Sequence, residues 1–267
     1  MSDKDNNSTD NDENALERAP EARGRGIYLL PNLFTTAALF AGFFAIVAAY
    51  DENYSMAAVA ILIAMVLDGI DGRVARLTNT TSAFGAEYDS MSDMVSFGVA
   101  PAFLIYSWSL STMRITEYGY LGWVCAFFYT ACCGLRLARF NVQVGKADKR
   151  FFQGLACPSA AALIACVVWV MDDLGVPGRE TEFLSVFVTL LSGLLMVSNF
   201  AYYSFKEYRA SNRIPFYVAM ALVLLVVFVS FDPPKVLLSG FFLYALSGPM
   251  HAAFRWIRKR NRSPLVK

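Results

Sequence analysis

The sequence predicts an all-α, polytopic integral membrane protein with about eight transmembrane helices. Of its 267 residues, 56% are hydrophobic and 15% are aromatic, which is too apolar for an ordinary soluble domain of this size. The apolar residues gather in runs of roughly 20, the length that a helix needs to cross the hydrocarbon core of a bilayer. Lys and Arg are frequent in every second loop between these runs, as expected when successive loops lie on opposite sides of a membrane.

The apolar runs define eight candidate spans in chain order. They are residues 31–50, 55–77, 87–109, 120–140, 157–172, 183–203, 214–231 and 236–254. Lys and Arg cluster before the first span and after the second, fourth, sixth and eighth, whereas each of the other loops holds one such residue or none. By the positive-inside rule we expect both termini, and the segment 68–93, on the cytoplasmic side.

Four acidic residues lie in or beside the second and third spans, at fixed distances from two glycines, an alanine and an arginine. The set is Asp68, Asp71, Gly72, Ala75, Arg76, Gly85, Asp89 and Asp93. Spacings of three and four residues place the first five on one face of a helix and the last three on one face of the next. Ionisable groups are costly inside a membrane and usually functional, and four carboxylates gathered in a low dielectric need cations between them. We therefore expect a metal site.

The ligand chemistry of this site favours particular ions. Carboxylate oxygens select hard divalent cations, so we expect Mg²⁺ or Mn²⁺, and two such ions roughly 3.5–4 Å apart are a common arrangement for displacement at phosphorus. The alternative is that the acids form structural ion pairs with Arg73, Arg76 or Arg139, although four acids are a costly way to brace two helices. All five cysteines lie in predicted spans, where we expect buried small hydrophobes, and His251 is the single histidine. Zinc or Ser-His-Asp chemistry is therefore not expected.

The spacing D-x2-D-G-x2-A-R-x8-G-x3-D-x3-D resembles the signature of the CDP-alcohol phosphatidyltransferase family at every fixed position. The resemblance implies a membrane enzyme that moves a phosphatidyl or similar group from a CDP-linked donor to an alcohol and releases CMP. It implies that Asp68, Asp71 and Asp89 bind the metal ions. Asp93 would be the base that takes the proton of the acceptor hydroxyl, a metal ligand, or both.

The same resemblance assigns the donor nucleotide to small and polar residues. Gly72, Gly85 and Ala75 would let the nucleotide approach the backbone, and Arg76 would pair with phosphate oxygens. Taken alone, the two glycines would more often be helix-packing positions in a membrane than ligand contacts; their place in the pattern favours the nucleotide. Asn32 and Thr35 lie one turn apart at the start of the first span and would face the nucleotide; the alternative is that they cap a helix that begins after Pro31.

Three further stretches, around residues 30–35, 92–102 and 134–141, resemble the membrane-integral branch of that family that transfers the phosphatidyl group of CDP-diacylglycerol to L-serine, giving phosphatidylserine and CMP. Together with the acidic motif, the resemblance covers roughly residues 27–160. This chain has Ala156 at a position where members of that branch commonly have proline. Arg136 and Arg139 would hold a lipid phosphate or the serine carboxylate, or would only anchor the helix end. Asn141 would bind the acceptor or cap the helix.

The chain is expected to divide into three parts. Residues 1–26 are polar without an apolar period and predict a disordered cytoplasmic tail, not a signal peptide. Residues 27–255 form the transmembrane catalytic domain. Residues 256–267 form a basic cytoplasmic tail that directly follows a span, so we expect it to anchor on membrane lipids and not to bind nucleic acid.

The resemblance also suggests a homodimer, and the topology suits a bacterial inner membrane. Two alternatives remain for the activity. The first keeps the chemistry but changes the acceptor to glycerol 3-phosphate, inositol phosphate or choline. The second is a cation transporter, because acids inside a membrane also mark ion pathways; it predicts acids spread across the membrane depth or an inverted repeat.

Overall fold

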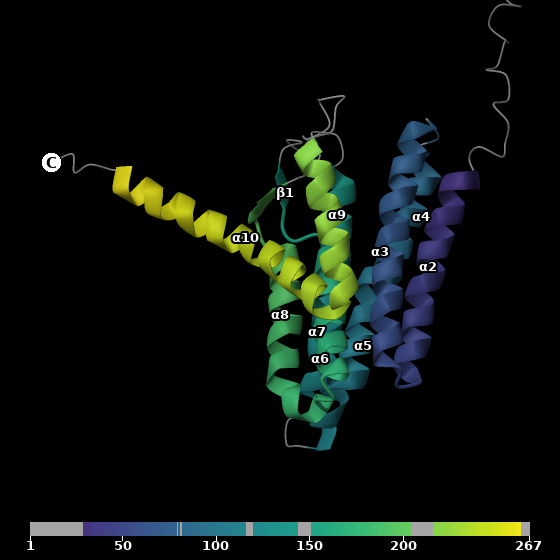
Figure 1. Cartoon of the computed structure of the whole chain (residues 1–267), viewed down its shortest axis with the longest axis vertical. Helices are drawn as coiled ribbons and strands as arrows, with labels where there is room; N and C mark the ends of the chain where they lie inside the picture. Colours follow the sequence, from purple (N-terminus) through teal and green to yellow (C-terminus); the bar gives the residue numbers. More distant parts are fainter. Residues whose placement is uncertain are drawn as a thin grey trace, which may run out of the picture.

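The computed structural model describes residues 29–78, 80, 82–115, 120–143, 151–203 and 216–262. Most of them belong to long helices that lie side by side in a bundle (Figure 1). The main helices are α2 (Leu29–Tyr50), α3 (Tyr54–Leu77), α4 (Ala83–Asp93), α5 (Ala100–Trp108), α6 (Leu121–Gln143), α7 (Cys157–Asp173), α8 (Glu182–Val197), α9 (Phe216–Phe231) and α10 (Pro233–Arg262). Short 3-10 turns, η2 (Leu110–Ile115) and η3 (Gly178–Thr181), follow α5 and precede α8. The N-terminal tail expected at residues 1–26 lies outside the described residues.

The expectation of an all-α integral membrane protein is confirmed. Each predicted span corresponds to a helix or to helices joined end to end, and five of the helices are long and apolar enough to cross a membrane. The five are residues 31–50, 54–77, 121–142, 178–197 and 233–255. The count of eight spans stays a prediction.

The sixth span is shorter than its apolar run. We expected a helix over residues 183–203, but α8 ends at Val197 because the backbone of Ser198 turns to an extended conformation. Residues Ala201–Tyr203 form instead the strand β2, which pairs antiparallel with β1 (Phe151–Gln153). Apolar composition alone could not separate the end of this helix from the strand, because both are built from the same residue types.

The helix that carries Asp89 and Asp93 contains a π-helical segment. The segment η1 (Met94–Val99) joins α4 directly to α5. Such segments are rare and occur often at functional sites. Pro101 has no N–H group to offer to the carbonyl group one turn before it, that of Phe97. The hydroxyl group of Tyr129 on α6 donates to that carbonyl oxygen over 3.0 Å, and the hydroxyl group of Thr130 donates to the carbonyl oxygen of Gly98 over 3.3 Å.

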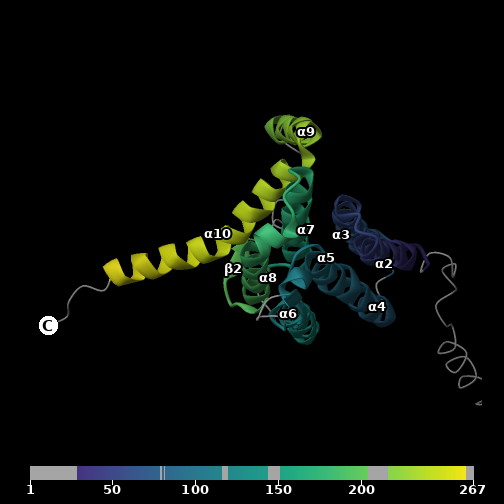
Figure 2. The same cartoon turned by 90° about the horizontal axis from the view of Figure 1, so that it is seen from below.

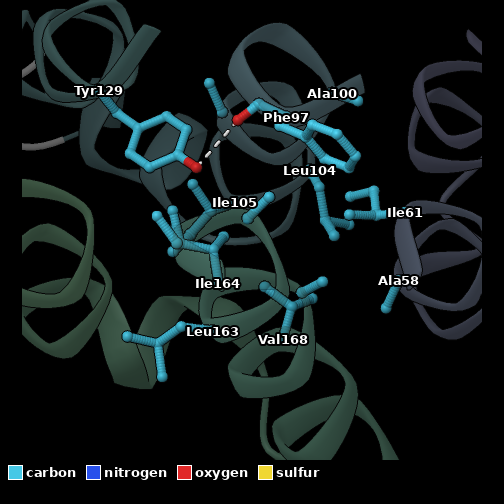
Figure 3. Packing of buried hydrophobic residues seen from close by; sticks show 14 of the residues in the cluster. Ala58, Ile61, Phe97, Ala100, Leu104, Ile105, Tyr129, Leu163, Ile164 and Val168 are labelled. Carbon is cyan, nitrogen blue, oxygen red and sulfur yellow. Dashed lines mark hydrogen bonds between the residues drawn. The ribbon is translucent and has the colours of Figure 1, made fainter. Parts of the chain in front are cut away.

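The core is centred on α7, which packs against α3, α5, α8 and α10 (Figure 2). Figure 3 shows apolar side chains of α3, α5 and α7 meeting there, among them Ile61, Leu104, Ile105 and Ile164. The closest helix pair is α2 and α3, whose facing surfaces consist mostly of alanine (Ala38, Ala41, Ala45, Ala48, Ala49, Ala57, Ala58, Ala60 and Ala64). Small residues allow backbones to approach closely, which is the usual basis of helix packing in membranes.

The helix α10 begins against α7 and then leaves the bundle at a steep angle (Figures 1 and 2). The hydroxyl group of Tyr202 in β2 donates to the carbonyl oxygen of Ala245 over 3.0 Å. One turn later, Gly248 lies against the Tyr202 ring, and a methyl group in place of its hydrogen would collide with that ring. This contact is where α10 separates from the bundle. The helix continues to Arg262, so residues 256–262 of the expected basic tail are helical.

Candidate metal and substrate site

The helix α2 supports both helices that carry the acidic residues. α3 and α4 pack along α2 but make few direct contacts with each other. The hydroxyl groups of Ser92 and Ser96 donate to the carbonyl oxygens of Thr35 and Ala38 on α2, over 3.2 and 3.1 Å. Gly42 makes this approach possible, because a side chain there would collide with Ser96. The acids of α3 and α4 therefore face each other across a gap that α2 closes from behind.

Three of the predicted acids converge in this gap. Asp68 and Asp71 on α3 and Asp89 on α4 each offer a carboxylate oxygen, and these oxygens lie within 4.8 Å of one another. The fourth acid, Asp93, lies beside Asp68 at hydrogen-bonding range. The two helices therefore bring three of the four predicted carboxylates together, with Asp93 next to one of them.

The carboxylates lack cationic partners among the residues that the structure describes. No Lys or Arg in these ranges forms an ion pair with any of the four acids, and one carboxylate oxygen of Asp89 is buried without a hydrogen-bond donor. A buried carboxylate oxygen without a partner is unfavourable by several kcal/mol. A bound cation would remove this cost, and a donor set made only of carboxylate oxygens fits a hard divalent ion. The residues present therefore fit a divalent metal.

The structural ion pairs that we considered as an alternative are not formed within the described part of the chain. Arg73 and Arg76 are exposed. Arg139 is directed elsewhere: its guanidinium group donates to Gln153 and, over 2.8 Å, to the side-chain oxygen of Asn199. These bonds tie α6 to β1 and to the residues that follow α8.

Thr35 on α2 contacts the acid cluster through a hydrogen bond. Its side chain is buried, and its hydroxyl group lies 2.8 Å from Oδ2 of Asp71, to which it donates. Both Thr35 and Asn32 lie inside α2, which begins at Leu29, so the alternative that they cap a helix starting after Pro31 is wrong. Asn32 directs its side-chain oxygen toward Gly85, where a methyl group would lie 3.6 Å from that oxygen.

The predicted nucleotide-binding residues of α3 border open space. A methyl group added at Gly72 would meet nothing nearer than the Arg76 guanidinium, at 3.9 Å. Ala75 is half-buried and Gly72 is exposed. Gly85 differs, because its N–H group donates to the side chain of Ser82, the N-terminal cap of α4, over 3.0 Å. Gly72 therefore leaves room for a ligand, whereas Gly85 contributes to a tight helix start.

The predicted acceptor residues Arg136 and Asn141 have different hydrogen-bond partners. Arg136 donates from Nη1 to the Cys157 sulfur over 3.4 Å, while its Nε–H group is buried and has no partner among the described residues. Asn141 donates to the hydroxyl group of Ser90 on α4 over 3.0 Å. It lies inside α6, which continues to Gln143, so the alternative that it caps the helix is wrong.

Sequence reasoning missed the contributions of Cys157 and Tyr129. The five cysteines are free and buried, as expected, but Cys157 also accepts a hydrogen bond from Arg136. Pro101 signals that the Phe97 carbonyl group lacks its helical donor. No local pattern indicates that a residue of α6 supplies that donor, because the contact joins residues 32 apart in the chain.

Comparisons with known proteins agree with this geometry. The sequence profile described as CDP-alcohol phosphatidyltransferase matches residues 28–197. A CDP-diacylglycerol–serine O-phosphatidyltransferase of Helicobacter pylori (strain J99) is 36% identical over 232 residues, which cover 86% of this chain and 92% of the relative. Proteins with the same description from Mycobacterium tuberculosis (strain H37Rv) and Methanocaldococcus jannaschii are 34% and 33% identical, over 77% and 70% of this chain and 70% and 80% of theirs.

Proposed function

The chain belongs to the CDP-alcohol phosphatidyltransferase family, and we propose that it transfers the phosphatidyl group of CDP-diacylglycerol to the hydroxyl group of L-serine, giving phosphatidylserine and CMP. The relatives named for this reaction match most of the chain. The observation that carries the proposal is the convergence of three carboxylates within 4.8 Å, in a cluster with no cationic partner among the described residues. Such a cluster suits a reaction between a diphosphate and an alcohol, because the diphosphate must be held by cations.

Asp68, Asp71 and Asp89 would hold two Mg²⁺ or Mn²⁺ ions, with Asp93 at the edge of the cluster. When bound, such ions neutralise the donor diphosphate and polarise the phosphorus atom that carries the lipid. The protein keeps this ligand set in place by buried contacts from α2. Thr35 orients Asp71 through its hydroxyl group, and the Ser92 and Ser96 hydroxyl groups fix α4 on α2.

Asp93 is the residue that we assign to proton transfer. The serine hydroxyl group has to lose its proton as its oxygen attacks phosphorus, and a carboxylate at hydrogen-bonding distance can accept that proton. In a direct displacement, the serine oxygen forms its bond to phosphorus while the bond between that phosphorus and the CMP oxygen breaks. The proton passes to Asp93 and CMP leaves as a phosphate monoester. The position of Asp93 beside Asp68 is compatible with a second role as a metal ligand.

The donor nucleotide would lie along the exposed face of α3. The open space at Gly72 lets a phosphate or the ribose approach the backbone. The Arg76 guanidinium lies one turn further on, where it would pair with a phosphate oxygen. Asn32 and Gly85 would border the nucleotide from α2 and α4, and Ala75 would keep the face flat.

Among the acceptor residues, Arg136 fits the serine carboxylate best. Its Nε–H group is buried and has no partner in the described part of the chain, and a carboxylate would satisfy it in a charge-assisted hydrogen bond. Arg139 and Asn141 already have side-chain partners. Their contribution to the acceptor site would be to hold α6 against α4 and α8.

We place the active site and both termini on the cytoplasmic side, because Lys and Arg cluster before the first predicted span and after the second, fourth, sixth and eighth. A bacterial inner membrane suits this topology. Residues 27–255 would form the catalytic domain between the two tails, and the family resemblance suggests that it acts as a homodimer.

The test is CMP release by the purified protein in detergent with CDP-diacylglycerol and Mn²⁺ or Mg²⁺. L-serine would be compared with glycerol 3-phosphate, inositol phosphate, choline and no acceptor. Release that requires L-serine, and that is lost in Asp93→Asn but kept in Asp173→Asn, is the expected result. Asp173 is a matched control, because it is an exposed acid at the far end of α7.

The two alternatives predict different outcomes of this assay. Release with another alcohol would keep the mechanism and replace the acceptor. The absence of release with any alcohol, together with cation flux in vesicles, would favour a transporter. The enzyme is favoured over the transporter, because three of the acids gather within 4.8 Å instead of following a path across the membrane.

A further inference from the structure

The last part of α10 is exposed beyond its contact with Tyr202. Ala245 and Gly248 attach the helix to the bundle through that residue. From Met250 to Arg258, the described side chains are exposed apart from the half-buried Ala252. Figures 1 and 2 show the helix running sideways, away from the other elements. We refer to residues 249–262 as the terminal segment.

One face of the terminal segment is apolar. Met250, Phe254 and Ile257 follow one another at intervals of four and three residues, so they lie within an arc of roughly 60° around the helix axis. Their exposed fractions are 66%, 64% and 50%. Met250 and Phe254 belong to the candidate span 233–255, so lipid would cover this face where the span ends.

The neighbouring face is basic. His251, Arg255 and Arg258 repeat the same spacing and lie about 100° around the helix from the apolar face. All three are exposed. Three more basic residues follow in the sequence by Arg262. An apolar stripe beside a basic stripe is the pattern of helices that lie in the interface between lipid head groups and acyl chains.

We propose that the terminal segment binds the anionic surface of the membrane, with its apolar face in the head-group boundary and its arginines on lipid phosphate groups. Charge complementarity supports this occupant, because polybasic segments next to a span attract anionic lipids. Position supports it as well: in Figure 1 the segment ends near the level of β1 and of the start of α4, which is the end of the bundle that carries the acid cluster.

A second copy of the chain suits the terminal segment less well as a partner than an anionic membrane surface does. Stable protein interfaces bury about 800 Å² on each partner, which three apolar side chains on one helix do not supply. The high density of arginine would also place like charges together across a symmetric contact. The proposal does not depend on the reaction, although anionic CDP-diacylglycerol and phosphatidylserine would be among the lipids gathered there if the proposed function holds.

The experiment is hydrogen exchange of the full chain in lipid nanodiscs. One set would contain only phosphatidylcholine, and the other would contain phosphatidylcholine with about a third phosphatidylglycerol. We expect backbone exchange in the terminal segment to slow by about tenfold in the anionic discs. The variant Arg255→Gln/Arg258→Gln should lose most of this difference, because each basic residue near an anionic surface contributes to binding.

Arg179→Gln/Lys235→Gln is the matched control, since it removes two exposed charges elsewhere in the chain and should keep the difference. Exchange in α7, measured in the same samples, reports whether each variant is folded. Equal exchange in both kinds of disc would overturn the proposal, and so would protection that depends on protein concentration. Because hydrogen exchange needs no substrate, its result is separate from that of the CMP assay.

Discussion

The hydroxyl group of Tyr129 on α6 donates to the backbone carbonyl oxygen of Phe97, in the π-helical segment that directly follows Asp93. Figure 3 shows this bond at the edge of the apolar core. Pro101 has removed the N–H group that would normally satisfy that carbonyl group. The bond therefore stabilises an irregular backbone close to the residue that we assign to proton transfer.

Tyr129→Phe should lower both stability and turnover. Loss of the bond leaves a buried carbonyl group unsatisfied, which costs about 1–3 kcal/mol, and lets the segment after Asp93 shift. We expect kcat to fall about tenfold or more with little change in KM for CDP-diacylglycerol. Tyr202→Phe is the matched control, because Tyr202 is also buried and also bonds a backbone carbonyl group over 3.0 Å, but lies outside the acid cluster. Equal losses of kcat in both variants would show a purely structural effect.

Thr35→Val should weaken metal binding. The hydroxyl group of Thr35 orients the Asp71 carboxylate, and removal of such a supporting contact typically lowers metal affinity 10- to 100-fold. The measurement is the Mn²⁺ concentration that gives half-maximal CMP release. Thr189→Val provides the comparison, since Thr189 is buried but bonds only within its own helix, to the carbonyl oxygen of Ser185. If the two variants needed the same Mn²⁺ concentration, the supporting role of Thr35 would be refuted.

Arg136→Lys and Arg139→Lys should have different effects. The Nε–H group of Arg136 has no partner among the residues that the structure describes and would bind an acceptor carboxylate, and lysine cannot replace its planar donor group. We expect a rise of about tenfold in KM for L-serine in Arg136→Lys. Arg139→Lys should instead lower the melting temperature, because Arg139 bonds Gln153 and Asn199. A larger rise in serine KM in the Arg139 variant would reverse the assignment.

Asp89→Asn should stabilise the metal-free protein while abolishing activity. The buried oxygen of Asp89 has no donor within the described ranges, and the carboxylate lies near two others, so removal of its charge relieves repulsion in the absence of metal. We expect a melting temperature a few degrees higher than that of the wild type in a chelator, and a smaller rise on addition of Mn²⁺. Asp173→Asn should change neither value. A lower melting temperature for Asp89→Asn in the chelator would contradict this account of the cluster.

The acid cluster could be predicted from the sequence because both of its parts obey helical spacing. Asp68 and Asp71, three residues apart, had to share a face of α3, and the apolar context made their charge expensive. What could not be predicted was the role of α2. No pattern around Thr35 shows that its hydroxyl group reaches Asp71, 36 residues away, because such a contact depends on how two helices pack.

The helix boundaries, too, could be predicted only in part. Long apolar runs identified α2 and α3 to within two residues, since nothing else in the chain competes with a membrane span for such a run. The π-helical segment and the strand β2 were missed. Both depend on partners distant in the sequence, Tyr129 for the first and Phe151–Gln153 for the second.

The separation of α3 from α4, which rest on α2 and scarcely touch each other, has a consequence for how the enzyme meets its donor. A gap between two membrane helices can receive the head of a lipid from the side while both acyl chains stay in the bilayer. The enzyme and its lipid donor then meet by diffusion in the plane of the membrane. The rate of encounter therefore depends on the mole fraction of donor among the lipids and not on its concentration in the sample. Dilution of CDP-diacylglycerol with inert phospholipid should therefore slow the reaction even when the total amount of donor is unchanged.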